Sequence, residues 1–163
     1  MKHLLSVTLL MLFTFGSTFA KDRVSKHTTV KGDLMSITYG QPNKKGRVIF
    51  GGLEPFDKVW RTGADEATEV TFNKNVTFGG KKVKAGTYTL FTKPGRQKWD
   101  IILNSKLGQW GAYEYDNTKD VVTVTSPVKQ LDKVVETFTI DVMKTGINMA
   151  WDQTSVFVEV KAD

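Results

Sequence analysis

Short runs of alternating apolar and polar residues make up most of the chain. In residues 136–144, Phe138, Ile140 and Val142 alternate with polar residues. Strand side chains point to opposite faces in turn, so this alternation predicts β-strands with one buried face. The same pattern occurs in residues 34–40, 68–73, 75–83, 85–103, 120–127 and 146–162.

Turn-forming residues divide these runs. Gly79-Gly80 and Pro94-Gly95 each separate two strand-like segments and predict hairpins. Pro127 marks the predicted end of one strand, and Asp152-Gln153 predicts a turn inside the last run. Short strands at about ten-residue spacing, without a long amphipathic helix, predict an all-β fold: a single antiparallel β-sandwich or barrel-like domain.

One short helical turn is predicted near residues 55–61. Pro55 suits the first position of a helix, and Gly63 suits the residue after its end. Residues 21–30 are polar and predict either a loose lead-in or an edge strand.

The first twenty residues have the pattern of a signal peptide. Lys2 is followed by the apolar run 4–15 and by the small-residue cleavage site Thr18-Phe19-Ala20. The run is shorter than the roughly 20 residues of a membrane-spanning helix, so a permanent anchor is the weaker alternative and stable membrane insertion is not predicted. Residues 21–163 are therefore expected to form one periplasmic or secreted domain. The chain has no cysteine, so no lipid anchor or disulfide is expected.

The chain carries a formal net charge of +6. Its clustered Lys and Arg residues lie beside Gly or Pro turn signals, where such charges usually keep hairpin ends soluble. The functional alternative is attraction to an anionic envelope polymer. The sequence contains no recognisable nucleic-acid-binding motif, so nucleic acid is not a predicted partner.

Chemistry is limited by the residue types present. His27 is the one histidine after residue 20 and lies in a polar stretch, so we expect it to be exposed. No metal site and no cofactor are predicted. Glycoside hydrolysis would need two carboxyl groups about 5 to 10 Å apart. The pairs available are Asp65 with Glu66, which should point to opposite sides of an extended backbone, and Glu114 with Asp116.

Two segments, 59–68 and 107–116, combine aromatic with polar side chains. Aromatic rings stack on sugar rings while planar polar groups bind hydroxyls, so both segments are candidate glycan-binding surfaces. In the second, Tyr113 and Tyr115 would share one face of a strand. The alternative for the tryptophans is burial in the core. The candidate ligand-binding residues are Trp60, Arg61, Asp65, Glu66, Trp110, Tyr113 and Tyr115.

The segment 58–70 has two interpretations. In the structural one, Trp60 packs into the core and Arg61 forms an ion pair with Asp65 or Glu66 that fixes a corner of the fold. In the functional one, Arg61 meets a ligand carboxylate, phosphate or sugar hydroxyl.

Three motifs carry a family resemblance: YGQPNKKGRVIFGGLEPFDKVWRTGADEATEVTF, then GGKKVKAGTYTLFTKPG, then WDIILN followed by QWGAYEYD. Together they resemble the exported bacterial family known as domain of unknown function 2911, over about residues 30–160. The resemblance implies one secreted β-rich domain and supplies no activity, cofactor or site residue.

Three functional hypotheses follow, and the oligomeric state stays open. The leading one is a non-enzymatic binding module for a glycan or another envelope polymer. The second is a carboxylate-dependent polysaccharide hydrolase, which should gather Asp65, Glu66, Glu114 or Asp116 in one concave site. The third is an envelope scaffold that pairs an exposed edge strand with a partner.

Overall fold

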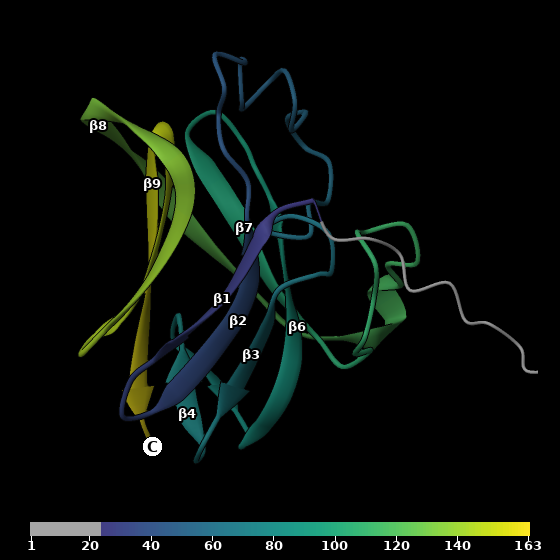
Figure 1. The fold of residues 1–163 in the computed structure, drawn as a ribbon. Helices are drawn as coiled ribbons and strands as arrows, with labels where there is room; N and C mark the ends of the chain where they lie inside the picture. Colours follow the sequence, from purple (N-terminus) through teal and green to yellow (C-terminus); the bar gives the residue numbers. More distant parts are fainter. Residues whose placement is uncertain (1–23) are drawn as a thin grey trace, which may run out of the picture.

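A computed structural model of the chain describes residues 24–163 (Figure 1). The predicted signal peptide lies outside the described residues. The elements found within them are β1 (Lys26–Lys31), β2 (Met35–Gln41), β3 (Glu69–Phe72), β4 (Val76–Phe78), β5 (Lys81–Val83), β6 (Gly86–Lys93), β7 (Lys98–Asn104), a 3-10 helix η1 (Asn117–Lys119), β8 (Asp120–Met143) and β9 (Gly146–Ala162).

All strands join one antiparallel sheet in the order β1-β2-β3-β6-β7-β8-β9-β4-β5. The predicted all-β antiparallel class is therefore confirmed. The hairpins at Gly79-Gly80 and Pro94-Gly95 are confirmed as β4–β5 and β6–β7, and both glycines of the first turn have a positive φ. Of the two alternatives for residues 21–30, an edge strand is found over Lys26–Lys31.

The long strand β8 changes partners halfway along. It pairs with β7 as far as Pro127 and with β9 from Val128 onwards. The predicted end at Pro127 is thus wrong, because the proline sits where the strand passes from one neighbour to the other. The predicted turn at Asp152-Gln153 is also wrong. Asp152 has a φ of 54°, but β9 continues through it beside a shift in pairing register.

The sheet curls so that its two halves face each other (Figure 1). Side chains from β2, β3, β6 and β7 meet those from β8, β9 and β4 in one buried cluster. At one end, Asn43 forms an antiparallel bridge with Thr137 of β8. Nearby, the Tyr39 hydroxyl accepts a hydrogen bond of 2.9 Å from the Ile140 backbone N–H. These contacts tie β2 to β8 across the core.

The helical turn expected near residues 55–61 is absent from the structure. Residues 56–58 form a turn and a bend, and the Asp57 and Trp60 N–H groups donate to the carbonyl oxygens of Pro94 and Thr92. The segment therefore continues the β-pairing at the end of β6, and this pairing overrides the local helical spacing. The helix found in the described residues is η1 instead.

Candidate functional site

The segment 60–68 forms a loop closed by its own backbone. Thr68 N–H donates to the Arg61 carbonyl oxygen, and the Thr68 hydroxyl donates to the Thr62 carbonyl oxygen at 2.6 Å. The loop lies directly against β2 at Gly40, where a Cβ would collide with the Ala64 carbonyl oxygen. Glycine at position 40 thus allows the loop and β2 to pack backbone to backbone.

Trp60 points inward from this loop. It is 3 % exposed, stacks on Trp151 at 5.8 Å between ring centroids, and has edge contacts with Phe50, Trp99 and Phe138. Its indole N–H donates to the Gly63 carbonyl oxygen. The interpretation of Trp60 as a core residue is confirmed, and its place among the ligand-binding candidates is not supported.

Arg61, the next residue, points outward. Its Nε donates to the same Gly63 carbonyl oxygen at 3.2 Å. Within residues 24–163, no carboxylate lies within ion-pairing distance of Arg61. The predicted ion pair with Asp65 or Glu66 is therefore wrong. Arg61 instead lines a cleft of about 680 Å³.

Asp65 holds the start of β1. Its Oδ2 accepts hydrogen bonds from the backbone N–H groups of Val24 and Ser25, at 3.2 and 2.9 Å. Burial alone would raise the pKa of Asp65, but these two N–H groups and His27 together hold it below its usual value. The ionised Asp65 side chain thus stabilises the start of β1, and it also lines the cleft.

His27 is not exposed as predicted. Its side chain is 18 % exposed, and Nε2 lies 3.4 Å from Asp65 Oδ2 and 3.2 Å from Glu66 Oε2. The two carboxylates therefore converge on one imidazole, whereas an extended backbone would have separated them. Asp65 has a φ of 62°, which breaks the alternation on which that prediction depended. Glu66 and His27 line a separate hollow of about 200 Å³.

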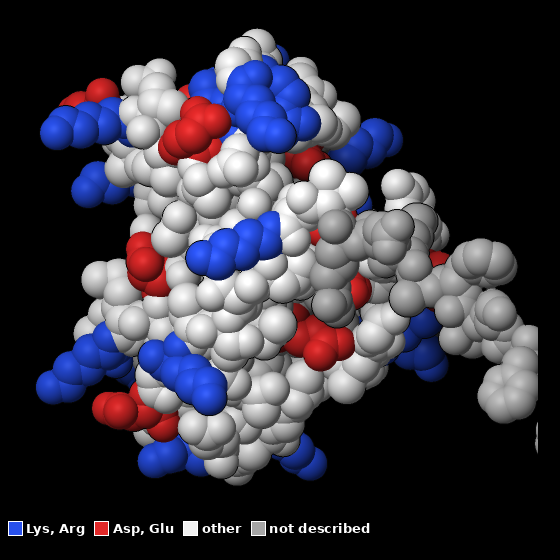
Figure 2. Space-filling model, in the orientation of Figure 1, with Lys and Arg blue, Asp and Glu red and all other residues white. Residues whose placement is uncertain are grey.

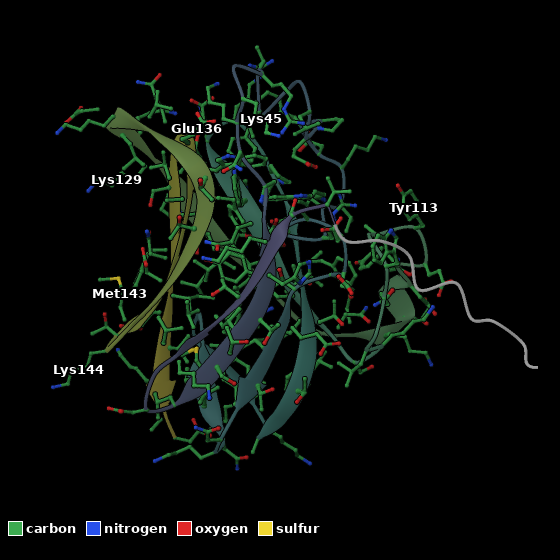
Figure 3. The ribbon with its side chains drawn as sticks, in the orientation of Figure 1. Lys45, Tyr113, Lys129, Glu136, Met143 and Lys144 are labelled. Carbon is green, nitrogen blue, oxygen red and sulfur yellow. The ribbon has the colours of Figure 1, made fainter. Side chains whose placement is uncertain are left out.

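The cleft beside Arg61 is rich in charge. Four cationic side chains and two carboxyl groups line it, together with the amides of Gln41 and Asn43; the charged residues are Lys26, Lys45, Arg47, Glu54, Arg61 and Asp65. Figure 2 shows Lys and Arg side chains gathered over the loops at the top of the molecule, with acidic groups beside them. Lys45 lies there beside Glu136 (Figure 3), whose carboxylate accepts a hydrogen bond from the Lys45 backbone N–H at 2.7 Å.

Glu54 was not among the sequence candidates. It is half-buried in the cleft wall, and burial raises its pKa to about 7, although Arg61 and Arg47 oppose that rise. No sequence pattern marked this residue, because its environment is made by segments that meet only in the fold.

The second aromatic segment is arranged differently from the prediction. Residues 111–114 form turns, so Tyr113 and Tyr115 do not share a strand face. Tyr113 is 82 % exposed and extends from its loop away from the sheet (Figure 3). Tyr115 packs edge-on against Phe91 and donates to Asp120 at 2.6 Å, and burial and that carboxylate raise its pKa.

The other candidates in this segment have local contacts. Trp110 is half-buried and forms a β-bridge with Glu66. Glu114 is exposed and pairs with Lys106 at 2.8 Å, which lowers the pKa of Glu114. Asp116 caps η1 by accepting from the Thr118 hydroxyl and N–H, and these bonds lower the pKa of Asp116. Both carboxylates thus have structural partners.

Two further observations limit the chemistry of the described residues. No group of three or more His, Asp or Glu side chains among them could hold a metal ion. None of their helices is long and apolar enough to cross a membrane.

Comparison with known proteins returned a family and nothing more specific. No curated protein and no solved structure matched the chain. A family model described as "Protein of unknown function (DUF2911)" matches residues 21–160, and the chain therefore belongs to the DUF2911 family.

Proposed function

We propose that this protein is a binding module for an anionic, hydroxyl-rich polymer such as an acidic glycan, and that the polymer binds in the cleft beside Arg61. The observation that carries the proposal is Arg61 itself: a half-buried arginine that lines the cleft and has no carboxylate within ion-pairing distance among residues 24–163. Guanidinium groups are well suited to carboxylate, phosphate and hydroxyl recognition because they present several donors in a fixed plane.

The rest of the cleft supports the same ligand chemistry. Lys26, Lys45 and Arg47 add positive charge around the rim, and the Gln41 and Asn43 amides can donate to and accept from hydroxyl groups. Exposed Val24 and Leu53 supply apolar edges. A hydroxylated anionic chain matches this mixture better than a purely apolar ligand does.

The hydrolase hypothesis receives less support. Asp65 and Glu66 converge on His27, but the Asp65 carboxylate already accepts two backbone hydrogen bonds that hold the start of β1. Glu114 and Asp116 have local partners and line neither the cleft nor the hollow. The scaffold hypothesis also receives less support at one sheet edge, where β5 has three residues and two are lysines.

Binding of acidic polysaccharides to purified protein tests the proposal. We expect Arg61→Ala to weaken binding about tenfold or more, the usual cost of losing a hydrogen bond to a charged group. Arg96→Ala is the matched control, because Arg96 is an exposed arginine that covers the Phe56 ring and does not line the cleft. Equal losses of affinity in Arg61→Ala and Arg96→Ala would show that the net charge of the protein, and not the cleft, attracts the polymer.

The proposal places the protein outside the cytoplasm, after cleavage near Ala20. Intact-mass measurement on protein recovered from the periplasm or medium should give a chain that begins at or near Lys21. A chain that retains Met1 would contradict export by this route.

A further inference from the structure

Glu54 is held at the cleft by a tightly bonded loop. The Glu54 N–H donates to the Ile49 carbonyl oxygen at 2.9 Å, and the Glu54 carbonyl oxygen accepts from Gly51 N–H at 2.9 Å. Gly51 has a φ of 87° and the Phe56 ring covers it, which leaves no room for a Cβ there. The backbone therefore fixes the position from which the Glu54 side chain enters the cleft wall.

The surroundings of Glu54 come from three parts of the chain. Arg61, from the loop 60–68, and Arg47, from the segment that follows β2, act electrostatically on its carboxyl group. Lys26 of β1, Lys45 and Asp65 line the same cleft. Despite the cations, burial raises the pKa of Glu54 to about 7. Below that pH the carboxyl group is neutral, and its O–H is a hydrogen-bond donor.

We propose that Glu54 and Arg61 form one subsite for a carboxylate group of an acidic sugar, in which protonated Glu54 donates a hydrogen bond to that carboxylate while Arg61 pairs with it. This inference rests on the proposed function, because it names the anionic group that the cleft binds.

Both side chains are needed for this recognition. An arginine fork matches the two oxygens of a carboxylate, and O–H to O⁻ hydrogen bonds are among the strongest in proteins. Ionised Glu54 would instead repel the ligand at short range and would compete with it for Arg61. The ligand therefore binds together with the proton that Glu54 takes up from solvent.

This coupling gives the subsite a pH dependence that a simple basic cleft lacks. Uronic acid carboxylates stay ionised across pH 5.5–8.5, so over that range the titration belongs to the protein. Above about pH 7, affinity should fall by roughly tenfold per pH unit, the limit for uptake of one proton. Below about pH 6 it should level off.

Titration calorimetry with a galacturonic acid tetramer, at constant ionic strength and in buffers of different ionisation enthalpy, tests this inference. At pH 8 the wild-type protein should take up close to one proton per tetramer, and at pH 5.5 close to none. Glu54→Gln keeps a donor that does not titrate, so it should bind with nearly the same affinity at both pH values and take up no proton. Glu114→Gln, an exposed carboxylate outside the cleft, should behave as wild type.

The outcomes separate this inference from the proposed function. If the tetramer binds through Arg61 but with neither proton uptake nor pH dependence, Glu54 is not part of the subsite and only this inference fails. A sulfated oligosaccharide of equal length that binds as tightly as the tetramer at pH 5.5 would overturn the choice of carboxylate. If Arg61→Ala leaves the binding of both probes unchanged, the proposed function fails as well. Thermal denaturation of each variant at pH 5.5 checks that it is folded.

Discussion

Trp60 and Arg61 are consecutive residues with opposite surroundings. Trp60 lies among aromatic rings of the core, whereas Arg61 faces a polar cleft. Both donate a hydrogen bond to the Gly63 carbonyl oxygen, so one backbone group fixes both side chains. The comparison shows that the core supports the site directly: the packing of one residue sets the position of its neighbour.

The two regions should respond to mutation in opposite ways. Core residues contribute stability through burial, and their loss leaves a cavity. Charged residues at a binding site often interact unfavourably with their surroundings in the folded protein. Replacing them therefore lowers the free energy of unfolding only slightly, or even raises it. Four substitutions test this contrast, from the largest expected effect to the smallest.

Trp60→Ala should lower the free energy of unfolding by roughly 3 to 5 kcal/mol, because it deletes a buried ring and its stacking on Trp151. Chemical denaturation measures the change. Val48→Ala, at a position that is 71 % exposed, should change stability by about 0.5 kcal/mol or less. Similar losses in the two variants would place Trp60 outside the core.

Asp65→Asn should cost roughly 1 to 3 kcal/mol at neutral pH, because the carboxylate accepts two backbone hydrogen bonds that anchor β1. The folded pKa of Asp65 lies below its usual value of 3.8, so this contribution is complete above that value and is lost as pH falls through the folded pKa. Denaturation midpoints of the wild type and the variant should therefore converge under strongly acidic conditions. A constant difference at all pH values would contradict the role of the charge.

Glu54→Gln should stabilise the folded protein at pH 8 by roughly 2 kcal/mol, a figure reduced for residual solvent screening. The folded pKa of about 7 lies above the usual 4.5, so the wild type loses stability as pH rises from about 4.5 to 7. The glutamine variant does not titrate there. At pH 4 the two proteins should have similar stability, and a stabilisation that persists at pH 4 would point to packing instead of charge.

Arg61→Ala should change stability by about 1 kcal/mol or less, since Arg61 has no ion-pair partner among the described residues. The thermal denaturation midpoint of the Arg61→Ala variant measures this change. The same variant should lose binding as proposed above. If an ion pair between Arg61 and Asp65 fixed this corner of the fold, Asp65→Asn would lower stability no more than Arg61→Ala does. The structure predicts the reverse order, so comparing these two variants distinguishes the interpretations most directly.

The sequence predicted the features that depend on local pattern. Alternation located most strands, and Gly79-Gly80 located a hairpin because glycine tolerates a positive φ. The size and apolar character of Trp60 favoured burial, as the structure confirms.

The features that sequence missed depend on contacts between distant segments. His27 meets carboxylates about forty residues further along the chain, and nothing in its polar neighbourhood indicates them. Asp65 and Glu66 converge because Asp65 takes a left-handed conformation that a non-glycine residue rarely adopts. Glu54 has an unusual pKa only because separate segments together bury it.

The change of partners along β8 also has a consequence for how the molecule unfolds. One continuous strand pairs with β7 over its first part and with β9 over its second, so neither half of the curled sheet can detach without breaking pairs made by that strand. Side chains of β7, β8 and β9 also share one buried cluster, so opening of either half should expose amide hydrogens on both sides of Pro127 together. Native-state hydrogen exchange should then find one cooperative unit that spans β7, β8 and β9.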